Sequence, residues 1–150
     1  MTTTSSSAHA DTTMPSDARA LLRRHGLRCT PSRLHTLSLL ARSGLHLSSA
    51  QVCAELHRLG APFDPATVYR TLEALTDAAL THAVHGPGPK RYGISSTPHH
   101  HTACEHCGHV GALASEHLRV AVERIAELAG LRPGTAGSLL VYGRCTSCGD

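Results

Sequence analysis

Residues 98–113 read PHHHTACEHCGHVGAL, so three consecutive histidines stand directly before a Cys-x-x-Cys pair. A second such pair lies near residue 150, and 37 residues separate the two pairs. Each pair can hold a metal ion from one tight turn, and together they supply four thiolates, the closed tetrahedral shell of a structural zinc site. The spacing therefore predicts a structural zinc ion held by Cys104, Cys107, Cys145 and Cys148.

Other uses of these cysteines fit the pattern less well. A redox-active Cys-x-x-Cys is expected once, at a strand–helix junction, and disulfides are rare in the cytoplasm. A catalytic zinc keeps one position open for water, whereas four cysteines fill the shell. The zinc-deaminase pattern requires proline before the first cysteine of the pair, and here Ala103 precedes Cys104. We therefore expect a structural zinc and no enzymatic activity.

The histidines are concentrated in the same region. Eight of the thirteen lie between positions 82 and 117. His99 and His101 alternate along an extended segment, so their side chains lie on the same side of it. Because imidazoles favour zinc, nickel, copper and iron(II), this run predicts either a second metal site or a polar, solvated linker. The isolated histidines are interpreted as ordinary surface or core residues: His9, His25, His35 and His57.

Length and charge set broad limits. The 150 residues suffice for one ordinary domain or two small ones, and the scarcity of aromatic residues leaves a core of Leu, Val and Ala. Residues 1–91 carry ten Lys and Arg against six Asp and Glu, whereas residues 92–150 carry four against five. This asymmetry favours a nucleic-acid-binding first part. The chain contains no apolar stretch of membrane-spanning length and no signal sequence, so we expect a cytoplasmic location and no membrane partner.

The first part of the chain predicts four helices after a Ser/Thr-rich tail at residues 1–15. Three helices have clear start signals: Thr30-Pro31, a capping box from Ser48 to Gln51, and Asp64-Pro65. The helix that precedes them covers DARALLRRHG, residues 17–26. The last two of the four are joined by a short link that contains glycine, which is typical of a helix-turn-helix.

The remaining pattern predicts strands and one further helix. Two β-like runs flank Gly86-Pro87-Gly88-Pro89, so a hairpin should follow the helix-turn-helix as the wing of a winged helix. Beyond a linker at residues 95–98 we expect strands around the first Cys-x-x-Cys, an amphipathic helix over residues 115–130 and a last strand over 138–143. The fold class is α+β, with a winged-helix domain at residues 16–94 and a small α/β domain at 99–150.

Five segments together resemble the ferric uptake regulator (Fur) family of metal-sensing repressors. They are GLRCTPSR (26–33), HLSSAQVCAEL (46–56), ATVYRTLEAL (66–75), HHHTACEHCGHV (99–110) and YGRCTSC (142–148). The resemblance implies a winged-helix DNA-binding domain hinged to a dimerisation domain that a four-cysteine zinc holds together. It also implies a homodimer that binds double-stranded, palindromic operator DNA, a regulatory metal at the hinge, and no small organic substrate.

The resemblance also assigns DNA-contacting residues. The recognition helix would run from Pro65 to Leu75, with Tyr69, Arg70 and Thr67 at the major groove and with Arg28 and Arg33 at the minor groove or backbone. Tyrosine can pack on a thymine methyl group, and arginine can bind guanine or phosphate. From the residues alone, an amphipathic helix with a half-buried tyrosine and a solvated basic face remain alternatives.

At the regulatory site the chain departs from the family pattern. His46, His99 and His101 fill the family's histidine positions, but the wing ligand falls near Gly93 or Ile94 and a later carboxylate falls at Ala112. Possible substitutes are His82, His85 and His109, and His82 resembles a wing histidine of nickel-sensing members. A third site of some relatives falls at Gly137, with possible remnants at His100 and at either Glu116 or His117.

The loss of carboxylates favours zinc or nickel over iron or manganese and argues against peroxide sensing. We therefore predict a metal-responsive transcriptional repressor. One alternative is a Fur-like regulator with structural zinc only, which binds DNA constitutively or senses redox state through Cys29 or Cys53. Another is a zinc-dependent enzyme or a zinc-ribbon adaptor for protein partners.

Overall fold

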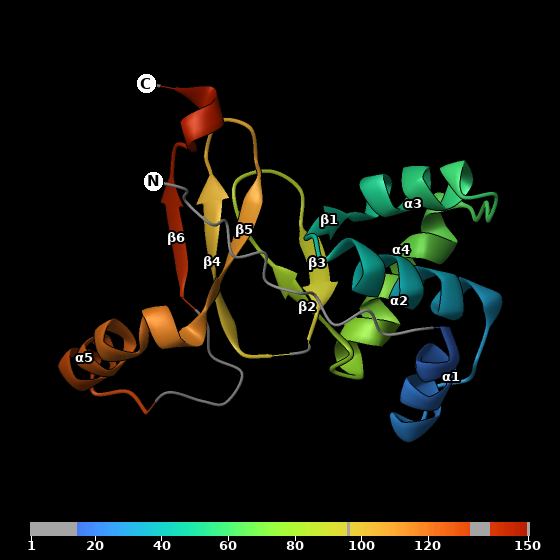
Figure 1. Ribbon diagram of the computed structural model, residues 1–150, viewed down its shortest axis with the longest axis horizontal. Helices are drawn as coiled ribbons and strands as arrows, with labels where there is room; N and C mark the ends of the chain where they lie inside the picture. The colour runs from blue at the N-terminus through green and yellow to red at the C-terminus, as the bar shows by residue number, and fades with distance from the viewer. Residues whose placement is uncertain (1–14, 96, 133–138, 150) are drawn as a thin grey trace, which may run out of the picture.

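The computed structural model describes residues 15–95, 97–132 and 139–149. Nearly all of the expected tail at residues 1–15 lies outside these ranges, as do Ser96 of the expected hinge and Gly137. In the described part, helices α1–α4 lie at one end of the molecule, and helix α5 lies at the other (Figure 1). Two small sheets lie between them.

Four helices build the first part of the molecule: α1 Pro15–Arg24, α2 Pro31–Ser43, α3 Ser49–Arg58 and α4 Pro65–Asp77. The hydroxyl oxygen of Thr30 caps α2, and a complete capping box between Ser48 and Gln51 opens α3. The Asp64 carboxylate caps α4 by accepting the N–H of Thr67. These contacts satisfy backbone N–H groups that a helix start leaves free, and they confirm the predicted helix starts.

A three-stranded antiparallel sheet completes this part. Its strands are β1 Leu47–Ser48, β2 Thr81–Val84 and β3 Arg91–Ile94, in the order β1-β3-β2. Strands β2 and β3 confirm the predicted wing, whereas the two-residue β1 was not expected. The core beneath them consists of Leu40, Val52, Leu56, Val68, Leu72 and Tyr92, each at most 1 % exposed. Full burial of one such aliphatic or aromatic side chain contributes about 1.5–3 kcal/mol, so this cluster fixes the wing against the helices.

The second part is a mixed sheet with one helix. Strand β4 (His99–Cys104) lies between the antiparallel β5 (Val110–Ala114) and the parallel β6 (Leu140–Gly143). Helix α5 covers Arg119–Ala129, and two short 3-10 helices cover Ser115–His117 and Thr146–Cys148. The predicted strands and helix are confirmed, and β4 includes the whole histidine run.

The wing lies against the second sheet. The side chain of Val84 at the end of β2 packs with Ala103, Val110 and Leu140, and the Tyr142 hydroxyl donates to the His85 carbonyl over 3.2 Å. Side chains of β2 and β4 are therefore in contact, although the strands belong to different sheets. This contact brings histidines from both parts of the chain to one place. Among the described residues, no helix is both long and apolar enough to cross a membrane.

Candidate metal centres

The four predicted zinc ligands come together where β4 and β6 end. The sulfur atoms of Cys104 and Cys148 lie 3.9 Å apart, those of Cys107 and Cys145 3.8 Å apart, and those of Cys145 and Cys148 3.5 Å apart. A tetrahedral zinc ion with Zn–S bonds of about 2.3 Å would place its sulfur ligands about 3.8 Å apart. The thiols are free, and their separations exceed a disulfide bond. The donor set and its spacing fit zinc.

Electrostatics at this centre also fits a bound cation. The Cys104 sulfur accepts the backbone N–H groups of Cys107 and Cys145, which lower the pKa of its thiol to about 5. Hydrogen bonds to Cys145 and Cys107 instead raise the pKa of Cys148 to about 12. Four sulfurs this close do not all ionise by themselves, because each new negative charge opposes the next. A divalent cation removes that repulsion, since it coordinates all four as thiolates.

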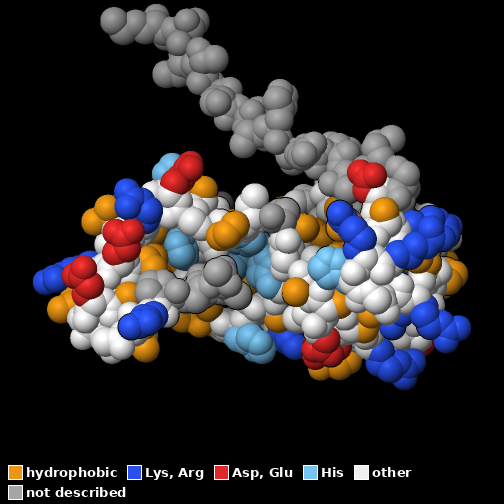
Figure 2. All heavy atoms as spheres, turned by 90° about the horizontal axis from the view of Figure 1, so that it is seen from below, with side chains coloured by type: hydrophobic (Ala, Val, Ile, Leu, Met, Phe, Trp, Pro, Cys, Tyr) orange, Lys and Arg blue, Asp and Glu red, His pale blue; other side chains and the backbone are white. Residues whose placement is uncertain are grey.

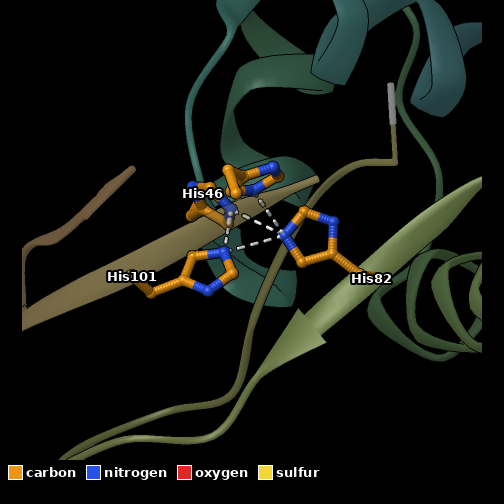
Figure 3. Close-up of side chains that lie close together, drawn as sticks. His46, His82 and His101 are labelled. Atoms are coloured by element: carbon orange, nitrogen blue, oxygen red, sulfur yellow. Dashed lines mark hydrogen bonds between the residues drawn. The ribbon is translucent and has the colours of Figure 1, made fainter. Parts of the chain in front are cut away.

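A second cluster joins the two parts of the molecule. It consists of His46 just before β1, His82 on β2, and His99 and His101 on one face of β4. The Nε2 atom of His82 lies 2.9 Å from that of His46 and 3.0 Å from that of His101. The Nε2 atoms of His101 and His46 lie 3.2 Å apart, as do those of His99 and His82. Figure 3 shows the rings of His46, His82 and His101 pointing toward one another.

This convergence fits a metal ion better than hydrogen bonding among the rings. A tetrahedral ion with metal–nitrogen bonds of about 2.0–2.1 Å would separate its ligand nitrogens by about 3.3 Å. The Nδ1–H of His99 donates to the Thr97 carbonyl over 2.7 Å, and His82 Nδ1 lies 3.4 Å from the Ser95 hydroxyl. The carbonyl partner holds the His99 ring in the tautomer whose Nε2 lone pair faces the centre. The donor chemistry of the four rings fits a second divalent metal.

Burial keeps the rings of His46, His82 and His101 neutral. Desolvation, followed by the neighbouring histidines, lowers the pKa of His46 from 6.5 to about 3. Burial likewise lowers the pKa values of His82 and His101 to about 4, with His99 as the next cause. A metal ligand must be deprotonated. Three of the four rings can therefore bind a metal near neutral pH without first releasing a proton.

The structure distinguishes among the histidines that the sequence left as alternatives. Of the three possible wing or strand substitutes, His82 lies in the cluster, whereas the exposed His85 and His109 are not part of it. The buried His100 points to the other side of β4 from its neighbours, where its Nδ1 accepts the N–H of Leu139 over 3.0 Å. Its structural role explains why it belongs to neither metal cluster.

The predicted DNA-contacting residues lie on the helical end of the molecule. Tyr69 is 49 % exposed, and Arg70 is exposed beside it on α4, where it donates to the Thr67 hydroxyl over 3.3 Å. Arg28 is exposed, whereas Arg33 is half-buried and donates to the Arg28 carbonyl over 3.1 Å. Figure 2 shows many Lys and Arg side chains at this end, others at the opposite end beside Asp and Glu, and histidines near the middle of the molecule. About half of the Tyr69 surface is covered, so its exposure agrees with the half-buried alternative as well as with a DNA contact.

Comparison with known proteins identifies the family over most of the chain. The sequence model described as "Ferric uptake regulator family" matches residues 24–136. The chain belongs to the ferric uptake regulator family. It is 34% identical over 133 residues to the ferric uptake regulation protein of Vibrio anguillarum, a match that covers 87% of this chain and 89% of that protein. It is also 27% identical over 132 residues to the peroxide-responsive repressor PerR of Staphylococcus aureus, covering 87% and 88%.

The fold agrees with a solved structure of the family. The ferric uptake regulator of Vibrio cholerae superimposes with a TM-score of 0.72 at 30% sequence identity, over 85% of this chain and 98% of that one. The chain is thus a Fur-family metalloregulator with a DNA-binding role, in a family of transcriptional regulators rather than enzymes. Because its relatives include regulators named for iron uptake and for peroxide, the comparison leaves the metal open.

Lowering the pH should destabilise this Fur-family protein when it holds zinc at the cysteines alone. The unfolded chain protonates His46 below its ordinary pKa of 6.5, whereas the folded protein keeps this 9 % exposed ring neutral to about pH 3. The unfolded state therefore binds more protons as the pH falls. Between about pH 7.5 and about pH 5.5, this one ring lowers the free energy of unfolding by about 1.4 kcal/mol.

Urea denaturation of the one-zinc form at both pH values measures this effect. His46→Gln should show a pH dependence smaller by about that amount. If wild type and variant lost equal stability, the ring would not be held neutral by the fold.

Proposed function

We propose that this chain is a homodimeric transcriptional repressor that binds palindromic operator DNA when a metal ion occupies the four-histidine site. The observation that carries the proposal is the origin of the four ligands. His46 and His82 belong to the winged-helix part, whereas His99 and His101 belong to the second sheet. We take residues 16–94 as the DNA-binding domain, 95–98 as the hinge and 99–150 as the dimerisation domain.

Because its ligands would come from both domains, a bound metal ion would control the relative orientation of the two domains. A bound divalent ion would accept the lone pairs of the four Nε2 atoms, and so favour the arrangement in which those atoms converge. The protein contributes the preset tautomer of His99 and the exclusion of water around His46 and His101. Linkage then requires that DNA tightens metal binding by the same factor by which metal tightens DNA binding.

Zinc or nickel is the favoured effector, with iron(II) as the weaker candidate. The cluster offers four imidazole nitrogens, and among the described residues no Asp or Glu belongs to it. Imidazoles suit zinc, nickel, copper and iron, whereas manganese and magnesium prefer carboxylate and carbonyl oxygens. The four cysteines would hold a separate, structural zinc ion.

An uncovered apolar surface supports a homodimer. Large apolar side chains on and beside α5 and β6 are between 47% and 73% exposed: Val120, Ile125, Leu128, Leu131, Val141 and Tyr142. In a soluble domain, apolar patches of this kind mark contact with another protein surface. A second copy of the chain meets this need and presents two winged helices to the two halves of a palindrome.

Arg70→Ala should weaken operator binding by about 5–150-fold, which corresponds to the roughly 1–3 kcal/mol of one specific arginine–base contact. The side chain is exposed on the recognition helix and holds only the Thr67 hydroxyl within α4, so folding should be unchanged. Fluorescence anisotropy on a duplex selected by metal-loaded wild type from a randomised pool measures the effect.

Arg119→Ala is the matched control, since Arg119 is exposed at the start of α5, on the opposite helix face from Leu128, and pairs with Glu123. It should bind the duplex like wild type, and both variants should keep the wild-type metal content. Equal affinities for Arg70→Ala and wild type would remove α4 from the interface. If metal-loaded wild type bound no duplex at low salt, the repressor proposal would fail.

The alternative hypothesis, a regulator that binds structural zinc and no second metal, gives no role to the histidine cluster. Four ring nitrogens from four separate positions in the chain meet there, with two of the rings held by outer hydrogen bonds. The alternative in which this regulator senses redox state requires Cys29 or Cys53. Their thiols lie near the carbonyls of Arg19 and Phe63, respectively, and contact backbone rather than a second thiol.

A further inference from the structure

Gly93 lies beneath the four-histidine cluster. It is a buried residue of β3, and in the sheet it is the register partner of His82 on β2. Its neighbour Tyr92 pairs with Leu47, the residue after His46. The central strand of this sheet therefore places Gly93 between the two histidines that the winged-helix domain contributes.

The ring of His46 occupies the space of a side chain at position 93. A Cβ atom built on Gly93 would lie 2.5 Å from His46 Nε2 and 2.6 Å from its Cδ2. Real Cβ atoms essentially never lie closer than 3.0 Å to such atoms. The blocked atom is the donor itself, since His46 Nε2 also lies 2.9 Å from His82 Nε2. Any larger residue at position 93 must displace this nitrogen.

Backbone conformation does not explain the glycine. Glycine is required where φ is positive, as at Gly44 and Gly60, but Gly93 is not among the positive-φ residues. Its backbone has the extended form of an ordinary strand residue. The position lacks room for a side chain, because the ring of His46, a candidate metal ligand, occupies that space.

Resting on the proposed regulatory role of the cluster, we propose that Gly93 determines the metal specificity of the site. Without a side chain, the wing strand supplies no oxygen or sulfur donor at this position and admits the imidazole of His46 instead. The opposite residue of the hairpin, His82, supplies the ligand of the wing. Gly93 thus makes the donor set entirely imidazole, which suits zinc, nickel or cobalt rather than manganese. Gly93 is a positioning residue, because it acts through His46.

Cobalt(II) titration of the one-zinc form tests this proposal, with visible absorption as the signal for the second site. Gly93→Ala should weaken cobalt binding by at least about 100-fold, since even a partner that merely orients a ligand contributes about 10–100-fold. Gly86→Ala on the same hairpin is the control. A Cβ there would meet Ala103 and Tyr142 at 3.6 and 3.7 Å, which is ordinary contact, so its affinity should stay within about threefold of wild type.

The double variant separates displacement of His46 from general damage. If Gly93 acts through His46, then His46→Ala/Gly93→Ala should bind cobalt no more weakly than His46→Ala alone. It should also melt higher than Gly93→Ala, because removing the ring relieves the clash. In the His46→Ala background, Gly93→Asp should bind manganese more tightly, relative to cobalt, than wild type does.

The outcomes distinguish the two proposals. Wild-type affinity in Gly93→Ala, or a further loss in the double variant relative to His46→Ala, would overturn the role of Gly93 and leave the four-histidine site intact. A one-zinc wild type that takes up no cobalt ion would overturn the regulatory site itself, and the role of Gly93 with it.

Discussion

Cys145→Ser should abolish zinc binding at the cysteine centre and unfold the second domain. This domain has little core to replace the metal, since its buried apolar cluster consists of Ala103 and Val110 with Val84 from the wing and the partly buried Leu140. A structural zinc ion in a small domain contributes on the order of 10–16 kcal/mol near neutral pH. We expect loss of the zinc ion by elemental mass spectrometry, loss of strand signal by circular dichroism, and loss of the dimer by sedimentation.

Cys29→Ser is the matched control. Its thiol is partly buried and faces the Arg19 carbonyl at 3.7 Å, a contact that a serine hydroxyl can also make. This variant should keep one zinc ion per chain, the wild-type melting temperature and the dimer. If Cys145→Ser retained its zinc ion and its fold, the four cysteines would not be the structural centre.

His101→Ala should lose the second metal and keep the first. The ring is 3 % exposed, and its Nε2 lies within 3.2 Å of those of His46 and His82, so its removal opens the centre of the cluster. We expect affinity for the second ion to fall by at least about 100-fold, more than outer-shell changes cause. Elemental mass spectrometry after zinc loading and dialysis should give two ions per chain for wild type and one for the variant.

His106→Ala controls for general loss of histidine, because His106 is exposed and lies between two zinc ligands of the other centre. It should retain both ions. A second ion that persisted in His101→Ala would place the regulatory metal elsewhere. A wild type that lost every ion but one under a mild chelator, and regained none on reloading, would make the histidine cluster a structural feature of the hinge.

Local signals in the sequence predict much of this fold. Thr30-Pro31, the Ser48–Gln51 capping box and Asp64-Pro65 begin helices in the structure as predicted, because cap chemistry depends on residues three positions apart. The wing hairpin and the approach of the two Cys-x-x-Cys pairs were equally predictable. Strand β1 was not, because two residues carry no periodicity and are held by pairing with β3.

The histidine site depends on contacts that no local pattern records. His99 and His101 alternate visibly along one strand, but the choice of His82 over His85 and His109 follows from how the wing packs on β4. Gly93 was recognised as a missing ligand, whereas its positive role emerges only once the His46 ring lies over it. The opposite orientation of His100, by contrast, follows from the alternation of β4, and the structure adds its hydrogen bond from the N–H of Leu139.

The central claim is that a metal ion at the four histidines favours the DNA-binding conformation. The direct test is the affinity of the dimer for the selected duplex, measured by fluorescence anisotropy at fixed salt, with zinc in the cysteine site and the histidine site either stripped or loaded. Linkage of this kind is typically about 5–150-fold. We predict tightening within that range for wild type and no change on loading for His101→Ala. Equal affinity of stripped and loaded wild type would contradict metal control of DNA binding.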